Sequence, residues 1–222
     1  MIIVHHLENS RSQRVLWLLE ELGVPYEVKR YERNKQTMLA PPELKAVHPL
    51  GKSPVITDGD TVVAESGLII EYLIENYGGG KLIPAEGSPE RLRYRYWLHY
   101  AEGSIMPLMV MTLILSKVAP GAPALIRPIA RAIVGQIHKA FLGPQTTLHL
   151  DYLESELAKS PWFAGNDITG ADIQMSFPLE AAAARGGLDE RRPRLVAMLK
   201  KMQERPAYQR ALKKGGPYQL LK

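Results

Sequence analysis

Hydrophobic residues in the first third of the chain switch between two spacings, the two-residue period of strands and the 3.6-residue period of helices. Residues 2–6 form a short β-branched run, and the apolar positions of residues 15–22 then recur at helical spacing until Gly23. Residues 26–31 alternate apolar and polar side chains again. The pattern therefore predicts a strand, a helix that ends before Gly23, and a second strand.

The next fifty residues continue this α/β pattern. A Pro-Pro pair begins a short helix predicted at residues 43–47. Two β-rich runs follow at residues 54–57 and 61–64, and the Gly-containing connector between them is typical of a tight hairpin. A further apolar run at helical spacing predicts a helix with Ser66 as its N-cap. The order β-α-β-α-β-β-α predicts a small α/β domain over residues 1–79.

Glycine and proline interrupt both spacings at residues 80–89, which we interpret as an interdomain linker. Beyond it we find no convincing strand pattern, and segments with helical periodicity continue as far as residue 213. Residues 90–222 are therefore predicted to form an all-α helical-bundle domain. Its predicted helices are residues 91–115, 128–142, 145–159, 171–185, 193–204 and 206–213.

One of these helices begins with a recognisable capping pattern. Thr169 and Asp172 have the hydroxyl-x-x-acid spacing of a capping box, with Asp in place of the usual Glu. We predict that this pair has a structural role.

The composition excludes several classes of protein. The chain has 222 residues and no cysteine, which excludes disulfide scaffolds, Cys-ligated zinc and a protein thiol nucleophile. No charged-then-apolar signal precedes residues 2–6, so a cytoplasmic location is expected. The most apolar stretch, residues 105–115, is shorter than the roughly 20 residues that span a bilayer, so no membrane contact is expected.

The net charge of +5 is unevenly distributed: residues 185–222 contribute +8 and residues 1–184 contribute −3. The basic residues near the C-terminal end alternate with apolar ones, as on a solvated helix face, and no aromatic-rich pattern accompanies them. Nucleic acid is therefore not an expected partner.

No metal site is expected either. His5 and His6 would point to opposite faces of a strand, so they could not bind one metal together. The other four histidines, His48, His99, His138 and His149, show no ligand spacing.

Two short stretches have residue types suited to binding a small zwitterion. Pro54 opens a strand, where its missing N–H breaks no ladder and the Ser53 backbone beside it stays free for an extended partner. Glu65 and Ser66 at a helix start place a carboxylate, a hydroxyl and free backbone N–H groups together. Asn9, Ser10 and Ser12 also lie at a strand-to-helix turn, although capping alone would account for them.

These stretches resemble a known family. The motif G-K-S-P-V at residues 51–55, followed by E-S at residues 65–66 and preceded by a Ser-containing helix start, is similar to the glutathione site of cytosolic glutathione S-transferases. The motifs S-R-S-x-R-V-L-W-L-L-E-E-L and A-P-P-E-L-K-x-x-H-P-L-G-K-S-P are most similar to Ser-type bacterial and fungal members, including the yeast glutathione transferase I type. The resemblance covers nearly the whole chain.

The resemblance implies a thioredoxin-like first domain and glutathione as co-substrate, with no other cofactor. It implies attack of the glutathione thiolate on an apolar electrophile or a hydroperoxide. It also implies a cis Ser53–Pro54 bond, which presents the preceding backbone to the cysteinyl part of glutathione. The glutathione-binding residues that it implies are Ser10, Lys52, Ser53, Glu65 and Ser66.

The catalytic hydroxyl is placed on Ser10 by the same resemblance, with Asn9 and Ser12 as open alternatives. A serine hydroxyl is a weaker acid than a thiol, so Ser10 would donate a hydrogen bond to the sulfur anion rather than act as a base, and Arg11 would add positive charge.

The resemblance also implies that the second domain supplies the electrophile pocket and that two chains form a homodimer. For the pocket we expect residues of a Met-rich patch, Met106, Met109 and Leu113. Tyr94, Trp97 and Tyr100 are expected in the same wall or in the subunit contact.

Two other functions remain open from the sequence. One is a glutathione-dependent disulfide reductase, which without cysteine would work only through bound glutathione. The other is a non-catalytic binding module of the stress-response kind, because fold does not determine function. The physiological electrophile is not readable from the residues.

Overall fold

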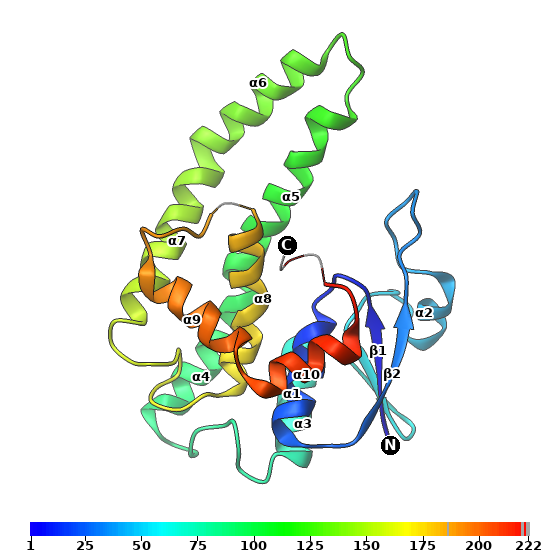
Figure 1. The fold of residues 1–222 in the computed structure, drawn as a ribbon, viewed down its shortest axis with the longest axis vertical. Coiled ribbons are helices and arrows are strands. Elements are labelled where there is room, and N and C mark those ends of the chain that lie inside the picture. Colours follow the sequence, from blue (N-terminus) through cyan, green and yellow to red (C-terminus); the bar gives the residue numbers. More distant parts are fainter. Residues whose placement is uncertain (186, 219, 221–222) are drawn as a thin grey trace.

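Strand β1 (Ile2–Leu7) lies inside a four-stranded sheet of order β2-β1-β3-β4 (Figure 1). It pairs in parallel with β2 (Tyr26–Tyr31) and antiparallel with β3 (Val55–Asp58), and β4 (Thr61–Ala64) pairs antiparallel with β3. The parallel pair needs a crossover connection, which α1 (Ser12–Leu22) supplies. The computed structural model describes residues 1–185, 187–218 and 220.

Helices cover both faces of this sheet because successive side chains of β1 point to opposite sides. Ile2 and Val4 join the main core together with the apolar side chains of α1 and α3 (Ser66–Tyr77). On the other face, α2 (Pro42–Val47) buries Leu44 in a small cluster with Leu7 and Tyr31. The predicted α/β order and the thioredoxin-like fold of the first domain are confirmed.

The prediction that Ser66 caps α3 was wrong. Ser66 is the first residue of the helix, and Glu65 occupies the N-cap position with no side-chain capping bond. The hydroxyl of Ser66 instead accepts hydrogen bonds from Arg14 Nη2 (3.1 Å) and Gln174 Nε2 (3.3 Å). These two buried donors come from other parts of the chain, so the hydroxyl is directed into the interior rather than toward the free backbone N–H groups of its own helix.

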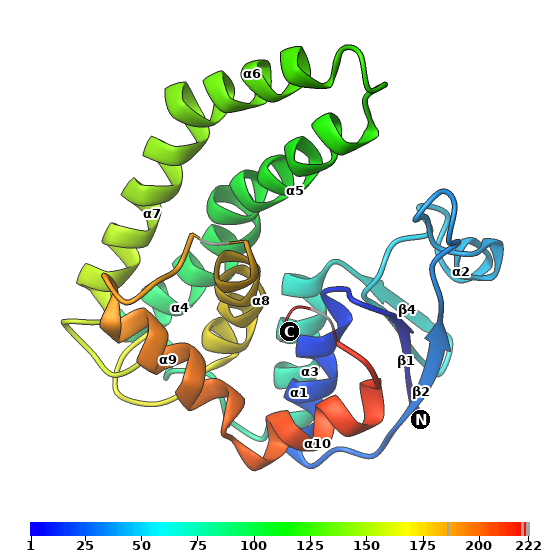
Figure 2. The ribbon, with the colours of Figure 1, turned by 45° about the horizontal axis from the view of Figure 1, so that its top comes forward.

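The second domain consists of helices, as predicted. Two long helical arms form a hairpin that projects from the rest of the molecule (Figures 1 and 2). The first arm comprises α4 (Pro89–Tyr100) and α5 (Met106–Gly121), and the second comprises α6 (Arg127–Ile137) and α7 (Gly143–Glu156). The remaining helices are α8 (Gly170–Ala184), α9 (Pro193–Gln203) and α10 (Pro206–Gly215).

Each arm contains a π-helical segment directly before a proline-bearing turn. The segments are Ala101–Ile105 and His138–Leu142, and Pro107 and Pro144 follow them at the second position of the next α-helix. Proline cannot donate the helical hydrogen bond and its ring collides with the carbonyl one turn back, which a wider π turn relieves. The second arm was predicted as two helices with a break near Gly143, and the π segment makes it continuous instead.

The aromatic residues of α4 lie in the core. Tyr94, Trp97 and Tyr100 were expected in a pocket wall or a subunit contact, but all three are at least 94% buried. Trp97 packs 4.9 Å from Phe163 between ring centroids, and Tyr152 stacks on it from the other arm. This cluster therefore joins the two arms to the rest of the helical domain, which removes it from any surface.

The capping box before α8 is confirmed. Asp172 Oδ2 accepts hydrogen bonds from the backbone N–H and the hydroxyl of Thr169 (2.8 and 2.9 Å), and its Oδ1 accepts from Phe163 N (2.9 Å). The pair anchors the start of the most buried helix of the molecule.

One helical run among the described residues, Pro89–Gly121, passes a length and composition test for crossing a membrane, with a mean hydropathy of 1.5 in its most apolar 18-residue window. This window is longer than the stretch at residues 105–115 considered above. Core helices of soluble proteins pass the same test, so the run by itself assigns no location.

Candidate active site

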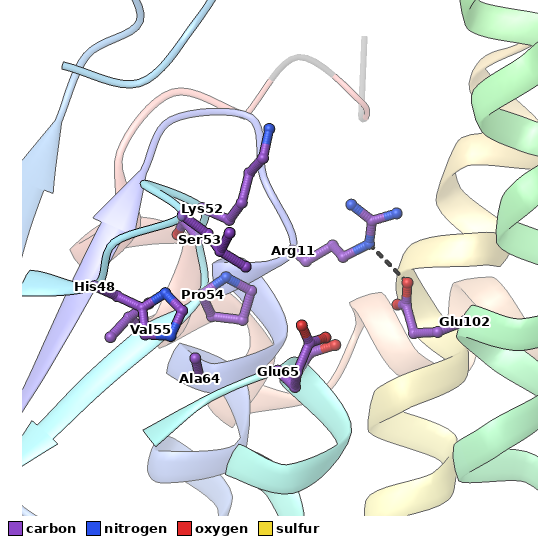
Figure 3. A pocket seen from close by; sticks show the side chains of 11 residues that line it. Arg11, His48, Lys52, Ser53, Pro54, Val55, Ala64, Glu65 and Glu102 are labelled. Atoms are coloured by element: carbon purple, nitrogen blue, oxygen red, sulfur yellow. Dashed lines mark ion pairs between the residues drawn. The ribbon is translucent and has the colours of Figure 1, made fainter. Parts of the chain in front are cut away.

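A cavity of about 290 Å³ lies where the ends of the two domains meet (Figure 3). Four of the five residues expected to bind glutathione line it: Lys52, Ser53, Glu65 and Ser66. The fifth, Ser10, is not among the lining residues. The complete lining is Arg11, His48, Leu50, Lys52, Ser53, Pro54, Val55, Ala64, Glu65, Ser66 and Glu102.

The Ser53–Pro54 peptide bond is cis, which confirms the prediction. Sheet pairing of this segment begins at Val55, so Ser53 lies outside the registers of β3. Its hydroxyl donates to the carbonyl of His5 (3.0 Å) and accepts from Leu7 N (3.3 Å). These bonds fix the Ser53 side chain to β1, and they place its backbone at the cavity wall.

Glu65 is held in an unusual backbone conformation beside the cavity. Its φ of 71° and ψ of 120° lie in a region that residues other than glycine rarely occupy. Such positions cost of order 1–3 kcal/mol and gather at ligand-binding sites. The carboxylate points into the cavity (Figure 3) and has no hydrogen bond or ion pair within the described part of the chain. This exposed carboxylate is therefore available to a cationic group of a ligand.

The turn before α1 contains the three candidates for the catalytic hydroxyl or amide. Ser10 Oγ lies 2.8 Å from Ser12 Oγ, which in turn lies 2.8 Å from His6 Nδ1. Ser12 is completely buried in this chain of hydrogen bonds. Ser10 Oγ lies 3.4 Å from the Oγ of Ser53, which lines the cavity, so Ser10 lies directly behind the cavity wall. Asn9 adopts a left-handed conformation with φ of 51°. Of the two serines, Ser10 thus lies closer to the cavity.

His6 is neutral at pH 7, because burial and the nearby Arg30 charge lower its pKa to about 4. A hydrogen bond from the ring to the carbonyl of Gly215 opposes this shift. With the ring proton directed at Gly215, Nδ1 of His6 is left as an acceptor for the Ser12 hydroxyl. The local network therefore orients Ser12 toward His6 and leaves its oxygen as an acceptor for Ser10.

Two arginines of the first domain meet one carboxylate of the second. Arg11 Nε lies 2.9 Å from Glu102 Oε2, and buried Arg14 donates to the other oxygen of Glu102. Both guanidinium groups also lie 5.5 Å from the ring centroid of Phe177 on α8. Glu102 is presented by the π-helical segment of the first arm, a kind of segment that is frequent at functional sites.

Sequence reasoning missed Glu102 and the role of Arg14. Arg14 also donates to the carbonyl of Gln174, 160 positions away, so it joins α1 to α8 through the interior. No local pattern marks either residue as part of the site. Pro107, inside the helix predicted at residues 91–115, is the one sequence signal near Glu102.

The three residues expected in the electrophile pocket lie in different environments. Met109 lines a second cavity, in the helical domain. Met106 is buried in the core and Leu113 is 41% exposed, and neither lines that cavity. Within the described residues, no group of three or more His, Cys, Asp or Glu side chains is placed to hold a metal ion.

Comparisons with known proteins match both domains of the chain to one family. The N-terminal domain of glutathione S-transferases matches residues 10–76, and the C-terminal domain of the same family matches residues 106–206. Glutathione S-transferase 3 of Schizosaccharomyces pombe is 41% identical over 182 residues, covering 82% of this chain and 74% of the relative. Glutathione S-transferase 1 of Saccharomyces cerevisiae is 37% identical over 193 residues, covering 83% of this chain and 82% of the relative.

Among solved structures, a glutathione S-transferase from Actinobacillus pleuropneumoniae matches with a TM-score of 0.80 and 34% identity. That match covers the whole of this chain and 96% of the other. With both family domains present in order and relatives this similar over most of their length, the chain belongs to the glutathione S-transferase family.

Proposed function

We propose that the cavity at the domain junction binds glutathione as the co-substrate of a transfer reaction. The observation that supports this best is the Glu65 carboxylate, which points into the cavity from a strained backbone and has no partner among the described residues. It would pair with the ammonium of the γ-glutamyl group. The start of α3 beside it would hold the neighbouring carboxylate with its backbone N–H groups.

The cysteinyl part and the terminal carboxylate of glutathione would contact other residues that line the cavity. The backbone of Ser53 would pair with the cysteinyl part, since it lies outside the sheet register. Lys52, an exposed cation at the edge of the cavity, is suited to the terminal carboxylate.

For the chemistry, we propose that the chain lowers the pKa of the bound thiol. A free thiol with a pKa near 8.5 is only a few per cent thiolate at pH 7. Ser10 would donate a hydrogen bond to the sulfur anion, and the positive end of α1 and the Arg11 guanidinium would add to its stabilisation. The thiolate would then attack an apolar electrophile, and detoxification in the cytoplasm is the role that this reaction would serve.

The experiment that tests the site is Glu65→Gln, with Glu75→Gln as the control on the exposed side of the same helix. The proposal expects the KM for glutathione to rise about tenfold in the first variant with a smaller change in kcat, because a charge-assisted contact is lost. The control should match the parent. Conjugation of 1-chloro-2,4-dinitrobenzene and calorimetric binding of glutathione supply the two readouts.

Unchanged glutathione affinity in Glu65→Gln would place the site elsewhere. Glutathione binding without any conjugation would favour the non-catalytic module instead, and activity confined to hydroxyethyl disulfide would favour the disulfide reductase.

A further inference from the structure

A second cavity, of about 170 Å³, lies in the helical domain between α5, α7 and the segment that follows α8. Three arginines line it, Arg185, Arg191 and Arg192, and no acidic residue is among its lining. Hydroxyl-bearing Thr146 and Thr147 face the same space. The cavity is therefore polar and positively charged, which an apolar electrophile would not require.

Two of the three arginines are neutralised by neighbouring carboxylates. Arg191 forms hydrogen bonds to both oxygens of Asp189 at 2.7–3.1 Å. Arg192 lies 2.8 Å from Asp151 and 3.8 Å from Asp189. Their charges are thus already compensated within the protein.

Arg185, at the C-terminal end of α8, differs from both. Its guanidinium has no hydrogen bond and no ion pair within the described part of the chain, although its Nη1 atom is buried. The side chain as a whole is half-buried, so the buried Nη1 is the donor whose partner is missing, and buried donors are normally hydrogen-bonded. Because the planar fork of a guanidinium matches a carboxylate, the missing partner has the chemistry of an organic anion.

Arg185 is linked to the first cavity through α8. Arg11 lies 5.5 Å from the ring centroid of Phe177 on α8, and Arg185 follows Phe177 two helical turns later, about 12 Å along the helix axis. Arg11 lines the cavity proposed for glutathione, and Met109 lines the second cavity beside Arg185. An electrophile with its carboxylate at Arg185 would therefore have to extend along α8 toward Arg11 to bring its reacting carbon to the proposed sulfur position.

We propose that the second cavity holds the carboxylate of an anionic electrophile and that Arg185 is the residue that selects it. This inference rests on the proposed function of the first cavity. In the reaction that tests it, the glutathione thiolate attacks the ring carbon bearing chlorine in 4-chloro-3-nitrobenzoate. A C–S bond forms, the C–Cl bond breaks, chloride leaves with the electron pair, and the thiol proton passes to solvent.

The experiment compares two electrophiles with the same leaving group, 1-chloro-2,4-dinitrobenzene and 4-chloro-3-nitrobenzoate, which has a carboxylate in place of one nitro group. For Arg185→Met we expect kcat/KM with the benzoate to fall about tenfold or more, mainly through KM, because a bidentate ionic contact is lost. The neutral electrophile should change by less than about twofold. Arg185→Lys should recover only part of the benzoate activity, since Lys offers no fork.

Arg191→Met is the matched control, because it removes the same charge from the same cavity at a residue that Asp189 already neutralises. It should leave the ratio of the two activities unchanged. Equal losses with both electrophiles in Arg185→Met, or an equal change of the ratio in the control, would overturn the proposal.

A direct binding measurement separates this inference from the proposed function. Calorimetric titration of 3-nitrobenzoate into the protein should show binding that Arg185→Met weakens about tenfold and Arg191→Met does not. Conjugation of the neutral electrophile without any binding of 3-nitrobenzoate would reject the anion site and leave the proposed function standing. Binding that depends on Arg185 in a protein without conjugation would support the anion site and reject the proposed function.

Discussion

At the scale of single residues, the direction of hydroxyl groups decides what the candidate site can do. Ser10 has one hydroxyl proton, and the oxygen of Ser12 is its nearest acceptor at 2.8 Å. A sulfur anion is a stronger acceptor than a neutral hydroxyl, because charge-assisted hydrogen bonds are about twice as strong as neutral ones. Binding of a thiolate would therefore rotate the Ser10 hydroxyl away from Ser12.

This competition leads to a prediction for the thiol titration. In Ser10→Ala the absorbance of bound glutathione thiolate should titrate at higher pH, by about one unit, because one hydrogen bond to the anion is lost. Glutathione should still bind. Ser12→Ala should shift the titration less or in the opposite direction, since it removes the competing acceptor while Ser10 remains.

An ultraviolet pH titration of the glutathione complex measures both variants, with Asn9→Ala measured alongside. A shift in Asn9→Ala or Ser12→Ala with none in Ser10→Ala would move the catalytic role along the turn. No shift in any of the three would show that this turn does not stabilise the thiolate.

At the scale of elements, the first turn of α8 determines how closely the two domains approach. Gly170 follows the capping residue Thr169 and lies against α3: a Cβ added there would meet Ile74 Cδ1 at 2.5 Å and Ile70 Cγ2 at 2.8 Å. Both isoleucines are buried and β-branched, so neither has room to move without repacking. Glycine is required at this position by packing, not by its backbone angles.

Gly170→Ala should therefore lower the free energy of unfolding by about 1–3 kcal/mol, the usual effect of overpacking a core. Gly135→Ala supplies the comparison on α6, where nothing lies within 4 Å of the added Cβ. That substitution should raise stability by about 0.5–1 kcal/mol, because alanine favours helix over glycine. Urea denaturation of both variants checks the signs; equal effects would refute the packing argument.

At the scale of the whole molecule, the C-terminal helix holds the two domains together. α10 packs on α1. Its N-cap residue Arg205 pairs with Glu21 of α1 at 2.5 Å, and Arg210 within the helix pairs with Glu20 at 2.7 Å. Tyr208 of α10 also donates a 2.5 Å hydrogen bond to buried Glu180 of α8. Tyr218, beyond the end of α10, donates to the second oxygen of Glu180, also at 2.5 Å. The Glu180 carboxylate thus connects Tyr208 and Tyr218 to the helical domain through two hydrogen bonds.

The stability of the fold should depend on pH through Glu180. Burial raises its pKa from 4.5 to about 7, although the two tyrosine hydroxyls oppose the shift. Between these values the unfolded chain has lost the proton and the folded chain retains it, so stability falls as pH rises from about 4.5 to about 7 and is level above that. The predicted loss is about 2–4 kcal/mol.

Glu180→Gln should remove this slope, because the amide oxygen accepts from one tyrosine and the amide nitrogen donates to the other. The free energy of unfolding measured in urea at pH 5 and pH 8 compares the variant with the parent. Parallel pH profiles for the two proteins would contradict the assignment.

We also predict a homodimer, with a mass in light scattering of twice the 24.8 kDa of one chain. Since Tyr94, Trp97 and Tyr100 are buried, the contact has to use other side chains. Exposed apolar residues lie on β4, α3 and α4, and Leu92 of α4 is 73% exposed. Leu92→Glu should therefore give a monomer, whereas Val196→Glu on the exposed side of α9 should not. A parent protein of 24.8 kDa at micromolar concentration would rule the dimer out.

The cis Ser53–Pro54 bond was predicted only through the family resemblance. The sequence by itself determined the elements of the first domain, the helical nature of the second and the capping box. These features depend on spacing and on neighbours within a few positions, where local sterics and hydrogen bonding decide the outcome. The motifs at residues 51–55 and 65–66 likewise identified four residues that line the cavity.

Only the tertiary structure decided which way several side chains of those elements face. Ser66 has the composition of a helix cap, yet its hydroxyl faces Arg14, because Arg14 and Gln174 are buried donors that need an acceptor. Glu102 reaches Arg11 through a π-helical segment, and Arg185 has no counter-ion among the described residues, whereas Arg191 and Arg192 both have one. Each of these facts depends on contacts between residues far apart in the chain, and no local pattern encodes the satisfaction of a buried polar group by a distant one.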